Sequence, residues 1–294
     1  MAKAVKQKFD FLPYALISPL ILFILGLAIT PAIFTAVSSF FRVQPLNPPT
    51  VFSGLENFRT IIHDSNVISS LSNTFLYIVI GVVLSTVLGI YFAIILQRKF
   101  RFRSILIAVL ILPWALPGVV EGILWTGIWD ANSGVLNSIL KSLHFISNYH
   151  VFLGQNRILT IFAIELVQVW QITPLSAILI LSALQNIPEE IYEAARIDGS
   201  SPWRTFRLIT LPLVRPGLAI ALVQAVIATL NIFDQPYILN GSATTGNSLA
   251  VQTYAVSFQN LNFGEGYGLS LLITIFTLFI SIFVAKFIYK KVEY

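Results

Sequence analysis

Long apolar stretches alternate with shorter polar stretches along almost the whole chain. An α-helix needs about 20 mostly apolar residues to cross a bilayer. Six stretches meet this length, at residues 12–40, 71–97, 104–128, 158–184, 210–233 and 268–289. The pattern predicts an all-α polytopic membrane protein, with six transmembrane helices in a single domain over residues 1–294.

Composition supports this prediction and narrows the class of protein. Hydrophobic residues make up 56% of the 294 residues and charged residues only 11%, with a mean hydropathy of +0.82. A typical soluble domain carries about 25% charged residues. These values exclude a soluble enzyme, a disordered chain and a nucleic-acid binder. The chain has no cysteine, and its three histidines lack metal-ligand spacing on a helix, so we expect neither a metal site nor a cofactor.

The distribution of lysine and arginine predicts the orientation of the chain in the membrane. One side has only Arg42, Arg59, Lys141 and Arg157. The other side has fourteen: Lys3, Lys6, Lys8, Arg98, Lys99, Arg101, Arg103, Arg196, Arg204, Arg207, Arg215, Lys286, Lys290 and Lys291. By the positive-inside rule, both termini and the loops 98–103 and 185–209 are cytoplasmic. The first apolar stretch lacks a small-residue cleavage site, so we interpret it as a retained anchor helix.

The cytoplasmic loop 185–209 has the pattern of two short helices joined by a turn. Pro188 suits the first position of a helix, and Gly199 suits the left-handed residue that ends one. Ser201 can cap the second helix, with Pro202 at its first position. Such short helices have little core of their own, and their apolar side chains predict a partner surface.

The same loop carries a specific resemblance. Glu193-Ala194-Ala195 is followed after three residues by Gly199, and after nine more by Ile209, with Leu211-Pro212 beyond it. This spacing resembles the cytoplasmic signature of permease subunits in binding-protein-dependent ABC importers. The stretch from Leu112 to Leu140 and the run 266–270 are similar to the sugar-permease branch of maltose, trehalose and glycerol-3-phosphate type.

The resemblance implies a set of partners for a chain that is not itself an enzyme. The signature loop would form the coupling helix that docks on a dimeric ATP-binding subunit in the cytoplasm. A second permease chain would complete the pathway as a heterodimer, and an external substrate-binding protein would deliver a sugar or oligosaccharide. The protein would then be a multi-pass component of the inner membrane, surrounded by lipid bilayer.

Polar residues inside the predicted spans are the candidates for a substrate pathway, because such groups are costly in a membrane. At helical spacing in the third span, Trp114, Glu121 and Trp125 form a stripe with Gly118. The set also includes Glu165, Gln168 and Gln171 in the fourth span, and Gln224, Asn231 and Asp234 in or beside the fifth. We expect Glu121, Trp125, Gln168, Gln171 and Asn231 to face one polar cavity, since indole rings, carboxylates and amides suit a polyhydroxylated ligand.

Two other interpretations remain at this stage. The polar groups can instead tie helices together, with Gly118 and Gly122 as a close-packing pair. Alternatively, Glu121 and Glu165 can act as proton relays in an ion-coupled secondary transporter. The coupling-loop signature favours the ATP-driven permease over that transporter.

Overall fold

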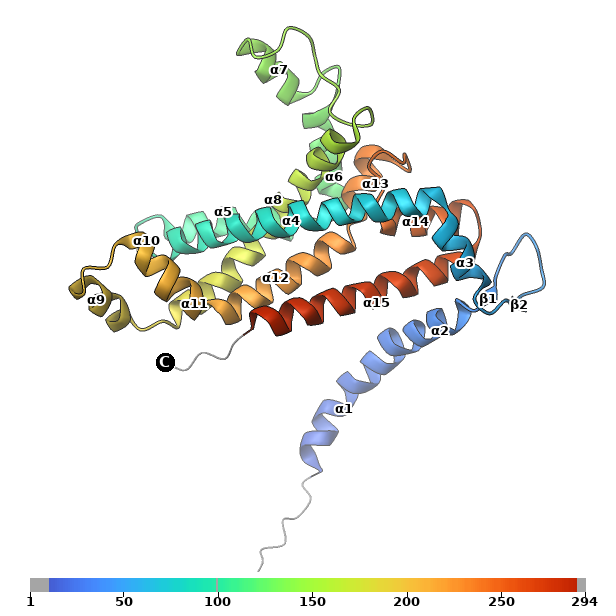
Figure 1. The fold of residues 1–294 in the computed structure, drawn as a ribbon, viewed down its shortest axis with the longest axis horizontal. Coiled ribbons are helices and arrows are strands. Elements are labelled where there is room, and N and C mark those ends of the chain that lie inside the picture. Colours follow the sequence, from blue (N-terminus) through green and yellow to red (C-terminus); the bar gives the residue numbers. More distant parts are fainter. Residues whose placement is uncertain (1–10, 99, 290–294) are drawn as a thin grey trace, which may run out of the picture.

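The computed structural model describes residues 11–98 and 100–289. Its core consists of helices α4 (Ser65–Gln97), α8 (Arg157–Gln185), α12 (Arg215–Leu230) and α15 (Phe263–Ile288), and α4 packs against both α8 and α12 (Figure 1). Within the described residues, five helices are long and apolar enough to span a membrane, or six if the bent pair α5 (Arg103–Ala115) and α6 (Gly118–Trp129) is one span. The predicted all-α membrane fold is confirmed.

Most of the remaining elements lie at the two ends of the bundle of core helices. One end carries α9 (Glu189–Ile197), α10 (Pro202–Thr205), η2 (Phe206–Thr210) and α11 (Leu211–Leu213). The opposite end carries α3 (Glu56–His63), a hairpin of β1 (Phe41–Arg42) and β2 (Val51–Phe52), α13 (Asp234–Asn240), α14 (Leu249–Tyr254) and η3 (Ala255–Gln259). The helix α7 (Val135–Ser142) projects beyond α6 in Figure 1.

The third predicted span, 104–128, is not one continuous helix. The axes of α5 and α6 differ by 99°. Leu116 is extended, with ψ of 140°, because a residue before proline is disfavoured in the helical region. Pro117 cannot donate a backbone hydrogen bond, so the helix ends before it and α6 begins at Gly118. The predicted stripe of Trp114, Gly118, Glu121 and Trp125 is therefore wrong, since Trp114 lies on α5 and the other three on α6.

The first span contains a π-helical turn instead of a simple proline kink. Its parts are α1 (Leu12–Ile24), η1 (Leu25–Ile29) and α2 (Thr30–Ser38). Pro31 lacks an N–H, and the Thr30 hydroxyl donates 2.8 Å to the Leu25 carbonyl, which accommodates the wider turn. None of the side chains of α1 is buried, and α1 stands away from the bundle in Figure 1, whereas α2 packs against α15.

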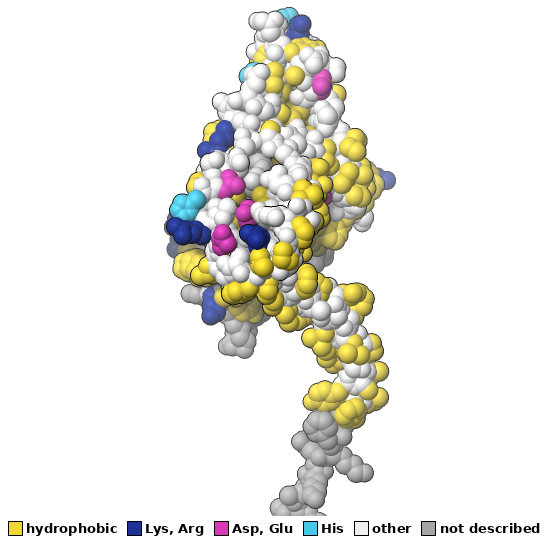
Figure 2. All heavy atoms as spheres, turned by 90° about the vertical axis from the view of Figure 1, so that its right-hand side faces the viewer, with side chains coloured by type: hydrophobic (Ala, Val, Ile, Leu, Met, Phe, Trp, Pro, Cys, Tyr) yellow, Lys and Arg dark blue, Asp and Glu magenta, His cyan; other side chains and the backbone are white. Residues whose placement is uncertain are grey.

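Polar caps begin the helices at the end of the bundle that carries α3. The side chain of Asp64 accepts from Asn66 N at the start of α4, and Asn156 accepts from Leu159 N at the start of α8. Ser248 caps α14 in the same way. Figure 2 looks onto this end and shows acidic, basic and histidine side chains gathered there, with apolar side chains along the flank and down the first span.

Tight helix crossings bring the core together at small residues. A Cβ added to Gly89 of α4 would lie 2.9 Å from Ser176 Cβ of α8, and one added to Gly217 of α12 would lie 2.8 Å from the Leu179 carbonyl of α8. Around these crossings, Leu96, Ile180 and other apolar side chains form a buried cluster. Close backbone approach at small residues is the usual means of packing membrane helices, because lipid supplies no hydrophobic force between them. Of the lysines counted for the orientation, five from the tails and one from the loop 98–103 lie outside the described residues: Lys3, Lys6, Lys8, Lys290, Lys291 and Lys99.

Candidate functional site

The signature loop folds as the two short helical segments that the sequence predicts. Pro188 is the residue just before α9, one position earlier than expected. Gly199 has φ of +72°, the left-handed conformation that ends α9. The Ser201 hydroxyl accepts from Arg204 N at 3.3 Å, and Pro202 is the first residue of α10. Three local predictions, at Gly199, Ser201 and Pro202, are confirmed.

One face of this loop is anchored and the other is exposed. Ala195 is buried, and the Tyr192 hydroxyl accepts 3.4 Å from the Thr210 hydroxyl, which ties α9 to η2. By contrast, Ile197 is 86% exposed and Trp203 is 70% exposed. Glu193 and Ala194 are also exposed, whereas Ile209, Leu211 and Pro212 are half-buried. Large apolar side chains left in water on a short helix are typical of a protein interface.

A buried polar cluster joins three helices in the transmembrane region. The Gln235 amide nitrogen of α13 donates to Glu121 Oε2 of α6 and to Gln171 Oε1 of α8, both at 3.1 Å. Glu121 is 0% exposed, and its other carboxylate oxygen has no hydrogen-bond partner among the described residues. The cluster therefore holds one unused acceptor in a site away from water. Gln235 lies just beyond the predicted fifth span, 210–233, and nothing in the sequence indicated that it would link Glu121 to Gln171.

Aromatic rings lie beside the same helices. The rings of Trp125 and Trp129 on α6 stack with centroids 5.5 Å apart, and Trp125 meets Trp170 of α8 edge-on at 5.7 Å. Phe152 packs 5.4 Å from Trp129, whose indole nitrogen is buried without a partner in the described part of the chain. Stacking faces next to a carboxylate and amides are the groups with which proteins bind sugars.

Two glycines let α6 and α13 approach closely enough to form the polar cluster. A Cβ added to Gly122 would lie 2.9 Å from Ile238, and one added to Gly118 would collide with the Asp234 carboxylate. Asp234 itself is half-buried at the start of α13. Gly118 and Gly122 thus form the close-packing pair that the sequence offered as one interpretation.

A second buried carboxylate, that of Glu165, lies on α8. Glu165 is 0% exposed, and neither of its carboxylate oxygens is hydrogen-bonded within the described residues. Its carboxylate packs directly over Gly81 of α4, where a side chain would overlap it. Gln168, one turn along α8, is also buried.

The structure does not bring all the predicted pathway residues together. Asn231 ends α12 with an exposed side chain, whose amide donates 2.8 Å to the Ile227 carbonyl of its own helix. Gln224 is half-buried on α12, and Trp114 is 48% exposed on α5. Of the predicted residues, Glu121 and Gln171 share Gln235 as a hydrogen-bond donor, and Trp125 lies one turn from Glu121 on α6.

The connection between α6 and α7 is ordered by hydrogen bonds at a single carboxylate. Asp130 accepts from the backbone N–H and the hydroxyl of Ser133, at 2.6 and 2.9 Å, and from Asn132 N. These donors hold the pKa of the Asp130 carboxyl below its ordinary value. Buried Asn137 of α7 donates to the carbonyls of Asp130 and His150. The segment that leaves the bundle is therefore fixed to α6.

Comparison with known proteins identifies relatives of this chain. The chain is 34% identical over 276 residues to the trehalose/maltose transport system permease protein MalF of Thermococcus litoralis, covering 94% of this chain and 92% of the relative. It is 30% identical to the sulfoquinovosyl glycerol transport system permease protein SmoG of Agrobacterium fabrum, covering 90% of this chain and 85% of that one. Its fold matches a chain of a bacterial alginate ABC transporter, solved with an alginate pentasaccharide-bound periplasmic protein, with a TM-score of 0.79 at 20% identity, over 94% and 93% of the two chains.

Residues 85–293 match the family described as the inner membrane component of binding-protein-dependent transport systems. The matched range contains the signature loop and the polar and aromatic clusters. This match does not favour the ion-coupled transporter that the buried carboxylates allowed. The chain belongs to the family of inner membrane permeases of binding-protein-dependent ABC transport systems.

Proposed function

We propose that this permease forms one half of the membrane pathway of an ATP-driven sugar importer. The observation that carries the proposal is the buried cluster of Glu121, Gln171 and Gln235 beside stacked tryptophans. Carboxylates accept from sugar hydroxyls, amides both donate and accept, and indole faces stack on the sugar ring. The names of two similar permeases, for trehalose/maltose and sulfoquinovosyl glycerol, support a carbohydrate as substrate.

The chain performs no chemistry in this proposal, and ATP is hydrolysed by a separate dimeric subunit. That subunit binds the exposed face of α9 and α10, which includes Ile197 and Trp203. ATP binding closes the ATPase dimer, and the anchored face of the loop transmits this motion to α12. The permease then shifts between two states, one open to each side of the membrane. A second, different permease chain completes the pathway, and an external binding protein delivers the sugar.

Binding measurements on the external protein test the substrate. We expect it to bind a sugar and to stimulate ATP hydrolysis by the complex only when loaded. A binding protein that ignores a broad panel of sugars but binds another class of solute would contradict the assignment to sugars while leaving the transport role intact.

Gly199→Val should uncouple ATP hydrolysis from substrate delivery. A Cβ at Gly199 meets nothing within 4 Å, so the effect comes from the backbone alone. The left-handed conformation costs an ordinary L-residue about 1–2 kcal/mol, and relief of that strain would turn α10 away from the ATPase. ATP hydrolysis stimulated by loaded binding protein should fall severalfold in the purified complex.

Gly199→Asn is the matched control, because asparagine tolerates the left-handed conformation. It should retain most of the stimulation despite its larger side chain. Full stimulation in the valine variant would contradict the proposed role of this turn.

The charge distribution further supports cytoplasmic termini and a cytoplasmic signature loop. Because the chain has no cysteine, single cysteines report on sidedness directly. A cysteine at exposed Ser242, in the loop after α13, should react with an impermeant maleimide added outside intact cells. One at exposed Asp198, at the end of α9, should react only after the membrane is opened. The opposite labelling pattern would reverse the orientation.

A further inference from the structure

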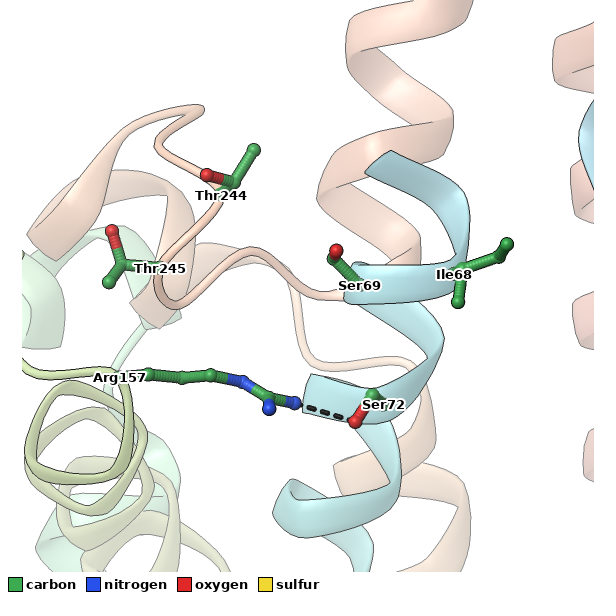
Figure 3. A pocket seen from close by; sticks show the side chains of 6 residues that line it. All are labelled: Ile68, Ser69, Ser72, Arg157, Thr244 and Thr245. Carbon is green, nitrogen blue, oxygen red and sulfur yellow. Dashed lines mark hydrogen bonds between the residues drawn. The ribbon is translucent and has the colours of Figure 1, made fainter. Parts of the chain in front are cut away.

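A polar pocket of about 420 Å³ lies at the end of the bundle that carries α3 and α14 (Figure 3). Its lining residues do not include Glu121, Gln171 or Gln235 of the buried polar cluster. It opens between the first turns of α4 and α8 and the loop joining α13 to α14. The lining residues are Ile68, Ser69, Ser72, Arg157, Thr244 and Thr245. Its volume equals that of about fourteen water molecules at ~30 Å³ each, enough for a charged headgroup.

Arg157 is held in place by neutral partners. Its Nε donates 2.8 Å to Asn73 Oδ1, and its Nη2 donates 2.6 Å to Ser72 Oγ. The buried Asn73 is fixed in turn, because its amide donates to the carbonyls of Thr244 and Asn247 at 3.1 and 2.8 Å. The bonds from Arg157 to Asn73 and Ser72 use two of the five N–H donors of the guanidinium. Within the described residues, the other three donors and the positive charge are left for a ligand.

Hydroxyl-bearing side chains line the space above the guanidinium. Figure 3 shows Arg157 reaching from α8 across to Ser72 of α4, and Ser69, Thr244 and Thr245 line the same pocket. An arginine in a pocket lined by hydroxyl groups matches a phosphate group, which offers several charged oxygens to a planar guanidinium.

The position of the pocket relative to the membrane, and the apolar side chains beside it, indicate that the phosphate belongs to a lipid. Arg157 is the first residue of a membrane span, which puts its side chain at the level of the lipid headgroups. Directly beyond Ser72, the side chains of Phe75, Val79 and Val83 are 61%, 45% and 55% exposed. Their spacing of four residues sets them along one face of α4. An acyl chain attached to a phosphate in the pocket would lie along this apolar stripe.

We propose that the pocket binds an anionic glycerophospholipid, with its phosphate on Arg157 and an acyl chain along Phe75, Val79 and Val83. A carboxylate of a soluble partner would use the charge but not the apolar stripe at membrane depth. Binding ties α4, α8 and the loop after α13 together, because the three elements already meet at Asn73. This inference does not depend on the identity of the transported solute.

Lipid titration of the purified, delipidated transporter in detergent tests the proposal. The probes are dioleoyl phosphatidylglycerol, dioleoyl phosphatidylcholine with the same acyl chains, and inorganic phosphate. Retention of bound lipid is measured by native mass spectrometry. We expect tighter binding of phosphatidylglycerol than of phosphatidylcholine, by roughly tenfold to a hundredfold, and a preference that weakens at high salt.

Ser69→Glu is the decisive variant, because it supplies an internal carboxylate to the guanidinium at an exposed position of α4. It should remove the preference for phosphatidylglycerol, and Arg157→Gln should do the same. Ser142→Glu, which adds the same charge at an exposed serine of α7, should keep it. The comparison between the two glutamates separates occupation of the pocket from added negative charge in general.

Three results would overturn the proposal. The first is equal binding of the two lipids by the unmodified complex, and the second is an unchanged lipid preference in Ser69→Glu. The third is binding of inorganic phosphate as tight as that of phosphatidylglycerol, which would make the pocket a site for free anions. If Ser69→Glu abolished stimulation by the binding protein while lipid preference persisted, the pocket would instead belong to a protein contact.

Discussion

Replacing Glu121 with alanine is expected to lower sugar uptake per assembled complex by roughly tenfold to a hundredfold. The substitution removes one of the two acceptors of the Gln235 amide nitrogen and leaves one of its N–H groups without a partner in a site shielded from water. A buried polar group without its partner costs about 1–3 kcal/mol, and 1.4 kcal/mol corresponds to a factor of ten. The measurement is uptake into proteoliposomes, normalised to the amount of complex recovered.

Two controls separate a role in transport from a role in folding. Glu121→Gln keeps the shape and one acceptor oxygen, so it should retain assembly and part of the uptake. Glu165→Gln replaces the other buried carboxyl group, which has no hydrogen-bond partner among the described residues, and should leave uptake close to normal. If Glu121→Ala reduced only the yield of complex, with normal uptake per complex, Glu121 would be a structural tie between α6 and α13.

We expect Gly81→Ala to destabilise the complex more than any other substitution that adds one methyl group to α4. The new Cβ would overlap both the Glu165 carboxylate of α8 and the Thr229 methyl of α12, at a point where three core helices meet. Overpacking of this kind costs about 1–3 kcal/mol. We expect a lower midpoint of thermal unfolding in detergent and a reduced yield of assembled transporter.

The double variant Gly81→Ala with Glu165→Ala tests whether overlap with the Glu165 side chain causes the loss of stability. Shortening Glu165 removes one of the two colliding groups, so the double variant should recover part of the lost stability. Gly127→Ala is the matched control, since a Cβ there meets nothing within 4 Å. A Gly81→Ala complex as stable as the unmodified one would mean that the helices are not packed this closely in the membrane.

Local sequence patterns were sufficient to predict five of the six spans and the turn of the signature loop. Span positions follow from the length of apolar runs. The turn between α9 and α10 follows from conformational preferences that act within a few residues: Gly199 in the left-handed region, Ser201 as a cap and Pro202 after it. Such features do not depend on what packs against them.

The candidate site was less predictable, because it depends on contacts between distant parts of the chain. Periodicity put Trp114 on one stripe with Glu121, but it cannot detect a 99° bend between them. A recognisable signal was present in Leu116-Pro117, where proline disfavours a helical residue before it. The link from Gln235 to Glu121 spans 114 positions in sequence, and no local pattern indicates it.

Polar residues in a span also do not reveal which way they face. Asn231 matched the expected chemistry of a sugar site, yet its amide bonds to its own helix at an exposed position. Arg157 was counted only as a charge in the topology argument. Its pocket emerges from the arrangement of α4, α8 and the loop after α13, which bring Asn73, Thr244 and Asn247 together.

The energy source for uptake tests the central claim most directly. The complete transporter, reconstituted with its ATPase subunits and loaded binding protein, should take up radiolabelled sugar only when ATP is present at the ATPase side. Dissipating the proton gradient with an ionophore should leave the rate unchanged. Uptake that continued without ATP and collapsed with the proton gradient would contradict the account and assign the buried carboxylates Glu121 and Glu165 to ion coupling.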